Sequence, residues 1–447
     1  MTAFWCELAW LGDERAEAGV VVEVEGGRIL AVTGDTPVPP PGAVRLEGLT
    51  LPGLANAHSH AFQRALRGRT HRGGGTFWTW REQMYRVADR LDPDTHRALA
   101  RATYAEMALA GITCVGEFHY LHHAPDGTPY DDPNEMGRAL IAAAADAGVR
   151  ITLLDACYLH GGIGEPARGP QRRFSDGTAE IWASRVEALS ESETARTGAA
   201  IHSVRAVDPG AAAIVSGWAA SRRRPLHAHV SEQPAENRAC LEAYRRTPSA
   251  VLQEAGALAA RFTAVHATHL EDSDVALLGG EGACCCACPT TERDLADGIG
   301  RMRRLLDAGA TLSLGTDSHA LIDMFEEARA VDLDERLASG ERGLHDAAGL
   351  LRAASEDGHA CLGWDDAGRL APGARADLVT VGLDGVRLAG TDPEHALEAL
   401  VFAASAADVR GVIVDGNEVV RDGRHLTVDV PRDLNDAVRG VASGAAA

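Results

Sequence analysis

Short apolar runs alternate with amphipathic stretches through the middle of the chain. Eight runs have the length of buried strands, and the stretches between them, such as 93–110, 134–147 and 301–308, carry apolar residues at helical spacing. The runs lie at 49–57, 112–115, 150–154, 199–204, 226–230, 262–266, 282–286 and 310–315. Eight alternations of strand and helix predict a closed (β/α)8 barrel of parallel strands.

The two ends of the chain have a different texture, with short β-like runs separated by turn residues. Runs at 20–24 and 28–32 flank Gly26-Gly27, and runs at 409–414 and 417–420 flank Asp415-Gly416, so each pair predicts a hairpin. We expect both ends to pair into one small β-sandwich. The predicted organisation is an α/β chain with residues 1–52 and 369–447 as the two parts of the sandwich and residues 53–368 as the barrel.

Charge and composition narrow the classes of partner. The formal net charge is −21, which disfavours nucleic acid and anionic membranes. The N-terminus lacks the pattern of a signal peptide, and no apolar run is long enough to cross a bilayer, so we expect a cytoplasmic protein. All the basic residues are arginine, which excludes a lysine Schiff base or a carboxylated lysine bridging two metal ions. Of the nine cysteines, the run at 284–288 predicts a buried strand of small residues.

Histidines and an aspartate follow four of the eight apolar runs. His58 and His60 end the first run, and alternate side chains of a strand point to the same face, so the two imidazoles project together. Later runs end at His229, His266 and Asp317. Because the chemistry of such barrels lies at the carboxyl ends of the strands, we expect these side chains to converge.

Three imidazoles and one carboxylate form a ligand set for a single divalent ion. His58, His60, His229 and Asp317 suit Zn²⁺, with Fe²⁺ as the alternative, and leave a position for water. A bound water of this kind has a pKa near 7. Asp317 is also a candidate acceptor for the proton of that water.

Two further residues are candidates for proton transfer. Glu232 follows His229 by three residues, which places a carboxylate in the same pocket and favours His229 over His227 as the ligand. His266, one strand further round the barrel, is the candidate for moving protons or stabilising charge. We expect His227 to be a strand histidine and His269 a loop residue.

These motifs resemble the amidohydrolase superfamily, and the H-x-x-E at 229–232 resembles its deaminase branch. More narrowly, four segments resemble the formimidoylglutamate deiminases: AHSHAFQRA at 57–65, FWTWREQMYR at 77–86, EFHY at 117–120 and HSVRAV at 202–207. The resemblance implies hydrolysis of N-formimino-L-glutamate to N-formyl-L-glutamate and ammonia, in histidine degradation. It also implies a homodimer.

The implied substrate is a small dicarboxylate, and arginine binds a carboxylate with two parallel hydrogen bonds. Arg81, in the segment after the first strand, and Arg205, just past the fourth strand, are the candidates for this role. Gln63, Tyr120 and His202 match family positions that line the same pocket. A few fixed arginines in a cleft that excludes water outweigh a diffuse surface charge.

Two other functions remain open from the sequence. A deaminase for a cyclic substrate, such as a purine or pterin, uses the same scaffold but needs flat apolar walls more than paired arginines. A non-catalytic scaffold is disfavoured because every proposed ligand is present. The Gly- and Arg-rich segment 161–173 predicts a lid over the site, and the segment 289–294 follows the seventh strand without an assigned role.

Overall fold

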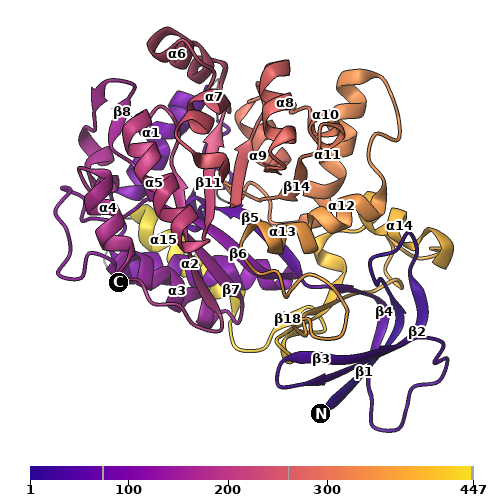
Figure 1. Cartoon of the computed structure of the whole chain (residues 1–447). Coiled ribbons are helices and arrows are strands. Elements are labelled where there is room, and N and C mark those ends of the chain that lie inside the picture. Colours follow the sequence, from indigo (N-terminus) through magenta and orange to yellow (C-terminus); the bar gives the residue numbers. More distant parts are fainter. Residues whose placement is uncertain (73–74, 260, 444–447) are drawn as a thin grey trace.

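The computed structural model describes residues 1–72, 75–259 and 261–443 (Figure 1). Eight parallel strands form the predicted barrel in chain order. They are β5 (Leu54–Ser59), β6 (Ile112–His119), β7 (Arg150–Cys157), β10 (Ala195–Ile201), β11 (Pro225–Val230), β12 (Arg261–His266), β13 (Cys284–Ala287) and β14 (Thr311–Leu314). A parallel bridge between Ser59 and Asp317 joins the first strand to the segment after the last, which closes the barrel.

Helices surround the barrel, most of them in the connections between strands (Figure 1). They are α1 (Phe77–Ala88), α2 (Pro93–Leu109), α3 (Glu135–Asp146), α4 (Ala179–Val186), α5 (Pro209–Arg222), α6 (Pro234–Tyr244), α7 (Pro248–Glu254), α8 (Asp272–Gly280), α9 (Pro289–Leu295), α10 (Met302–Asp307), α11 (Met324–Ser339), α12 (Ala347–Ala353) and α13 (Glu356–Cys361). Two of them, α2 and α5, begin at an aspartate followed by proline. Asp92, for example, accepts a hydrogen bond from Thr95 N at 2.8 Å, and Pro93 takes the first helical position.

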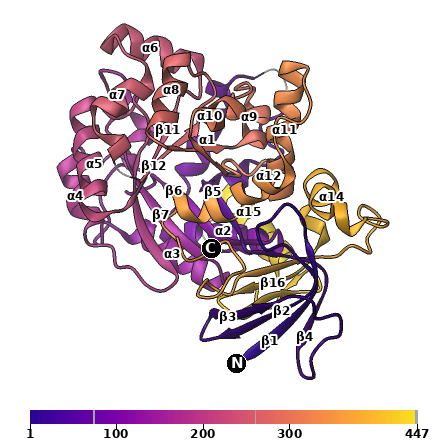
Figure 2. The ribbon, with the colours of Figure 1, turned by 45° about the vertical axis from the view of Figure 1, so that its right-hand side comes forward.

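The two ends of the chain build a second sheet with the strand order β18-β17-β16-β15-β4-β1-β2-β3. Its strands are β1 (Thr2–Ala9), β2 (Glu17–Glu25), β3 (Arg28–Thr33), β4 (Val44–Pro52), β15 (Leu378–Val381), β16 (Val409–Val414), β17 (Asn417–Arg421) and β18 (Arg424–His425). Both predicted hairpins are present, and β4 pairs with β15, so the N-terminal and C-terminal parts share one sheet beside the barrel (Figure 2).

A buried ion pair joins this sheet to the barrel. Arg150, the first residue of β7, pairs with Asp377 and lies 3.2 Å from Asp415. Burial alone would raise the pKa of Asp377, but the charge of Arg150 reverses that effect and holds it below its ordinary value. The C-terminal region also contributes helices: α14 (Ala396–Ala403) packs on α11, and α15 (Val430–Ser443) packs on α2.

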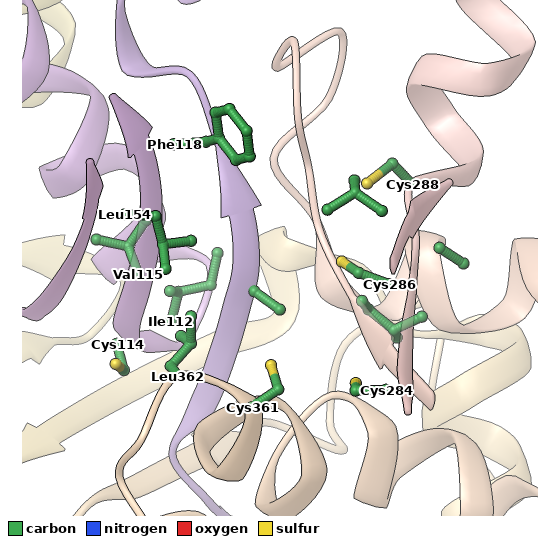
Figure 3. Packing of buried hydrophobic residues seen from close by; sticks show 14 of the residues in the cluster. Ile112, Cys114, Val115, Phe118, Leu154, Cys284, Cys286, Cys288, Cys361 and Leu362 are labelled. Carbon is green, nitrogen blue, oxygen red and sulfur yellow. The ribbon is translucent and has the colours of Figure 1, made fainter. Parts of the chain in front are cut away.

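The predicted cysteine strand is present as β13, and all four of its residues are buried. Cys284 and Cys286 lie among aliphatic side chains inside the barrel, and all nine cysteines are free thiols (Figure 3). The segment 161–173 contains two short strands, β8 (His160–Gly162) and β9 (Glu165–Pro166), which pair with each other. Among the described residues, no helix is both long enough and apolar enough to cross a membrane.

Candidate active site

The structure brings the four proposed metal ligands to one point at the carboxyl ends of the strands. His58 Nε2 lies 3.2 Å from His229 Nε2 and 3.4 Å from Asp317 Oδ1, and His60 Nε2 lies 3.4 Å from the same carboxylate oxygen. All four side chains are buried. The convergence follows from barrel closure: Asp317 N donates to His58 O at 3.0 Å, and His60 N donates to Asp317 O at 3.1 Å.

Backbone hydrogen bonds orient two of the imidazoles. His60 Nδ1 donates to Phe118 O at 2.9 Å, and His229 Nδ1 donates to His202 O at 2.8 Å. A carbonyl oxygen only accepts, so Nδ1 carries the proton and each Nε2 presents a lone pair to the shared centre. Lone pairs and a carboxylate facing one buried point form a donor set that fits a divalent cation.

Electrostatics keep this donor set in its metal-binding protonation state. Burial lowers the pKa of His58 to about 3, and it also lowers the pKa of His60 and His229, so the imidazoles are neutral at physiological pH. Burial alone would raise the pKa of Asp317, but its hydrogen bond with His58 reverses this effect and keeps the carboxylate ionised.

The proton-transfer candidates lie at one side of the same centre. His266 Nε2 is 3.9 Å from Asp317 Oδ2 and 4.0 Å from Glu232 Oε1. The His266 ring stacks on that of His229, with centroids 5.6 Å apart and planes 14° apart. Glu232 also lies 3.3 Å from Arg205 Nη2. Three titratable side chains are therefore close enough to exchange protons through a bound substrate or water.

Left-handed backbone conformations turn these side chains into the barrel mouth. Ser231, His266, Asp317 and His319 have φ between +42° and +68° although none is glycine. Each such residue costs about 1 kcal/mol or more, and conformations of this kind concentrate at functional sites. Gly315 allows the close approach of β14 to β5, because a Cβ atom there would lie 2.7 Å from the Cβ of His58.

A cavity of about 300 Å³ opens over the centre. All five proposed substrate-binding residues line it: Gln63, Arg81, Tyr120, His202 and Arg205. Gln63 Nε2 donates to the Tyr120 hydroxyl at 3.1 Å. The Arg81 guanidinium lies over the rings of Trp78 and Tyr85, at 5.5 and 5.2 Å from their centroids. Two cations on aromatic walls therefore face the same small cavity as the proposed metal ligands.

Several cavity residues were not predicted from the sequence. Tyr158 directly follows β7, and its hydroxyl accepts hydrogen bonds from Arg81 at 3.3 Å and from Gln171 at 3.0 Å. Applying the strand-end rule to β7 would have found it. Glu236, in the first turn of α6, lies 3.4 Å from Arg205 Nε. Ile163 and Phe174 show that the predicted lid segment and the residue after it line the cavity.

The two histidines expected to be structural lie away from the centre. His227 is fully buried, and its Nε2 donates to Cys361 O at 3.2 Å. His269 Nε2 donates to Asp297 O at 2.6 Å in the segment after β12. Neither of them lines the cavity.

Fold and site together define a hydrolytic enzyme built on a (β/α)8 barrel. The chain belongs to the amidohydrolase family, whose model matches residues 49–419. The chain is 39% identical over 397 residues to the formimidoylglutamate deiminase of Pseudomonas aeruginosa, covering 86% of this chain and 87% of the relative. It is 30% identical over 430 residues to the 5-methylthioadenosine/S-adenosylhomocysteine deaminase of Natronomonas pharaonis, covering 95% and 93%.

Solved structures agree with the fold. An amidohydrolase from Brucella melitensis superposes with a TM-score of 0.91 at 32% identity, covering 99% of this chain and all of that chain. A zinc-bound adenosine deaminase from Xanthomonas campestris superposes with a TM-score of 0.85 over 99% of this chain and 98% of that chain. At 23% identity this match supports the fold alone.

Proposed function

We propose that this enzyme hydrolyses N-formimino-L-glutamate to N-formyl-L-glutamate and ammonia, a step of histidine degradation. The observation that carries the proposal is that Arg81 and Arg205 line the same cavity as His60, His229 and Asp317 of the donor set. The substrate has one amidine-like end for hydrolysis and two carboxylates for the guanidinium groups. The similarity to the Pseudomonas aeruginosa deiminase supports the same substrate class.

The pocket offsets the negative charge of the whole molecule at the point where an anion must bind. Burial, followed by the charges of Arg205 and Arg81, lowers the pKa of His202 well below its ordinary value. Burial is the larger cause of this shift, and the two guanidinium charges add to it. Arg81 is partly buried against the rings of Trp78 and Tyr85, so a carboxylate bound there is partly shielded from solvent, which strengthens its attraction to the guanidinium.

The proposed metal ligands are His58, His60, His229 and Asp317. A divalent ion held there, Zn²⁺ first and Fe²⁺ as the alternative, would supply Lewis-acid activation of water at neutral pH. Asp317 takes a proton from the attacking water. Its Oδ1 faces His58 and its Oδ2 faces His266, so the carboxylate lies between the metal ligands and the proton-transfer residues.

His266 and Glu232 complete the proton transfers. His266 stabilises the charge that develops as water adds to the formimino carbon. Glu232 delivers a proton to the imino nitrogen and holds it as it leaves as ammonia. One water is consumed for each C–N bond broken, and the formyl oxygen comes from that water.

A deaminase of a cyclic substrate is the second candidate, favoured by the 30% identity to a 5-methylthioadenosine/S-adenosylhomocysteine deaminase. The aromatic residues of the cavity, among them Phe77, Trp78 and Tyr85, would suit a flat ring. Paired arginines have no role with a neutral purine, which is why we prefer the dicarboxylate.

Ammonia release by metal-loaded enzyme separates these candidates. We expect turnover of N-formimino-L-glutamate with kcat/KM at least about 10³-fold above that for 5-methylthioadenosine, since a neutral purine has no carboxylates to bind Arg81 and Arg205. N-formimino-L-aspartate tests the length of the side chain in the same assay. Faster release from the purine nucleoside would reject the proposal.

Arg205→Met tests the carboxylate-binding role. We expect kcat/KM to fall roughly 30- to 5,000-fold, because one substrate carboxylate loses its partner. This loss is equivalent to about 2–5 kcal/mol of binding free energy. Arg205→Lys keeps the charge without the planar fork and should recover part of this loss. Arg222→Met is the matched control, since Arg222 pairs with Glu187 on the surface. An Arg205→Met enzyme with wild-type kcat/KM would refute the role.

A further inference from the structure

The segment after β13 contacts His266 on the side of the ring that faces away from the cavity. Glu292, on the short helix α9, places Oε1 3.3 Å from His266 Nδ1. His266 lines the cavity and Glu292 does not, so the carboxylate contacts the imidazole on the side away from the substrate. Glu292 is buried, with 5% of its surface exposed.

Glu292 is itself held in place by the backbone around it. Cys288 N donates to Glu292 Oε1 at 2.9 Å, which ties the carboxylate to the end of β13. Thr290 N donates to Glu327 Oε2 at 3.0 Å, which anchors the start of α9 to α11. The Glu292 carboxylate is therefore a fixed acceptor.

The same segment braces the neighbouring catalytic strand. Ser318 N donates to Thr291 Oγ1 at 3.1 Å, and the two hydroxyls lie 3.1 Å apart. Ser318 directly follows Asp317. Residues 289–292 thus bridge the ends of β12 and β14, which carry His266 and Asp317.

The consequence for His266 is a defined orientation of the ring. A carboxylate only accepts, so Nδ1 carries a proton toward Glu292 and Nε2 faces Asp317 and Glu232. The backbone at His266 has φ +68°, outside the extended conformation of its strand, so the strand alone does not set the direction of the ring. Glu292 contacts Nδ1 of the ring, and His229 stacks on its face, so side chains set the direction instead.

We propose that Glu292 is a positioning residue that fixes His266 for proton transfer, an inference that rests on the proposed function for the part played by His266. The competing interpretation is a second metal site, because His266, Cys288 and Glu292 each offer a ligand atom within 4.8 Å of the others. Burial raises the pKa of Cys288 well above its ordinary value, so an ion bound there would first have to displace the thiol proton.

Steady-state kinetics of Glu292→Ala and Glu292→Gln test the proposal. We expect Glu292→Ala to lower kcat by about 10–100-fold with KM within threefold of wild type, because the residue does not touch the substrate. Glu292→Gln keeps an acceptor for both Cys288 N and His266 Nδ1, so it should lose less and it protects the test against a folding defect. Arg293→Gln, on the same helix but in surface ion pairs with Glu326 and Asp334, is the control.

A double-mutant cycle separates positioning from general damage. If Glu292 acts through His266, Glu292→Ala should not slow a His266→Ala enzyme further. An equal loss in both backgrounds would overturn the proposal, as would a rise in KM at constant kcat. If the wild type held two metal ions per chain and Glu292→Ala held one, the second metal site would be established instead.

One readout is independent of the substrate. In a crystal structure of metal-free Glu292→Ala, we expect the His266 ring to leave the orientation it has in metal-free wild type. An unchanged ring would overturn the positioning role. Failure of the wild type to release ammonia from N-formimino-L-glutamate would reject the proposed function and leave this structural test intact.

Discussion

Two clusters of buried histidines, each with an aspartate, lie in the same barrel. One is the candidate metal centre, with His58, His60 and His229 around Asp317. The other lies between β6, β7 and α2, and its members are His96, His119, His122, His123 and Asp155. Burial lowers the pKa of His58 and His96 to about 3 and that of His122 to about 4. By residue type and burial, the two clusters are alike.

They differ in what neutralises the aspartate. Asp155 accepts hydrogen bonds from both terminal nitrogens of Arg185, at 2.8 Å each, and from Trp182 Nε1 at 3.0 Å. Among the described residues, the ion-pair partners of Asp317 are all histidines. Asp155 already has the Arg185 cation in direct contact, whereas the histidines nearest to Asp317, His58 and His60, are neutral. The charge nearest to Asp317 is on His266, 3.9 Å away, because burial alone would lower the pKa of His266 but neighbouring carboxylates reverse that effect and raise it to about 10.

They also differ in which imidazole nitrogen is engaged. His122 uses Nε2, the atom closer to Asp155, to donate to Ala156 O at 2.9 Å. His60 and His229 use Nδ1 for the backbone. Their Nε2 atoms therefore face the shared centre, that of His60 3.4 Å from Asp317 and that of His229 3.2 Å from His58 Nε2. A set of ligand-type residues becomes a metal site only when imidazole lone pairs and a carboxylate meet at one point.

Asp317→Asn should give the largest effect. It removes the negative ligand and the proton acceptor together, so we expect kcat/KM to fall by at least about 10³-fold, equivalent to about 4 kcal/mol. Metal content by mass spectrometry should fall below one ion per chain. Asp155→Asn is the matched control and should keep its metal. Loss of metal from Asp155→Asn and not from Asp317→Asn would reverse our assignment of the two clusters.

Asp155→Asn should instead act on stability. The buried Arg185 loses one of its two carboxylate partners and keeps the other, Asp176, at 2.9 Å. Breaking a buried ion pair costs about 3–5 kcal/mol. We therefore expect the free energy of unfolding, measured in urea, to fall by about 3 kcal/mol. Asp272→Asn, which removes an exposed partner of Arg301 and Arg304, should change it by less than about 1 kcal/mol. Equal effects of the two substitutions would show that burial of the pair does not matter here.

Sequence reasoning reached most of the barrel and most of the proposed centre for one physical reason. The carboxyl ends of parallel strands share one mouth, so any polar residue at such an end is a candidate. That rule located His58, His229, His266 and Asp317 without knowledge of any helix position.

The same rule could not distinguish the two clusters or find Glu292. His119 also ends a strand, and Asp155 lies on the next one, yet the neutralising Arg185 comes from α4, 30 residues later. Glu292 reaches His266 only because α9 folds back after β13. Both contacts depend on how loops return to the barrel, and hydrophobic periodicity does not encode that. The C-terminal helix α15 was not predicted, because the sequence of this region was interpreted only as strands and turns.

The smallest expected effect tests the burial of the second cluster. Both ring nitrogens of His96 lack a hydrogen-bond partner among the described residues, and burial lowers its pKa to about 3. In the unfolded chain, His96 takes up a proton near pH 6.5, whereas in the folded protein it stays neutral at that pH. The free energy of unfolding therefore falls as the pH drops below that value. His96→Leu removes this proton and no hydrogen bond. Between pH 7 and pH 5, the variant should lose about 2 kcal/mol less unfolding free energy than wild type, measured in urea. The exposed His395→Leu should follow the wild-type curve, and a parallel curve for His96→Leu would mean that His96 is protonated in the fold.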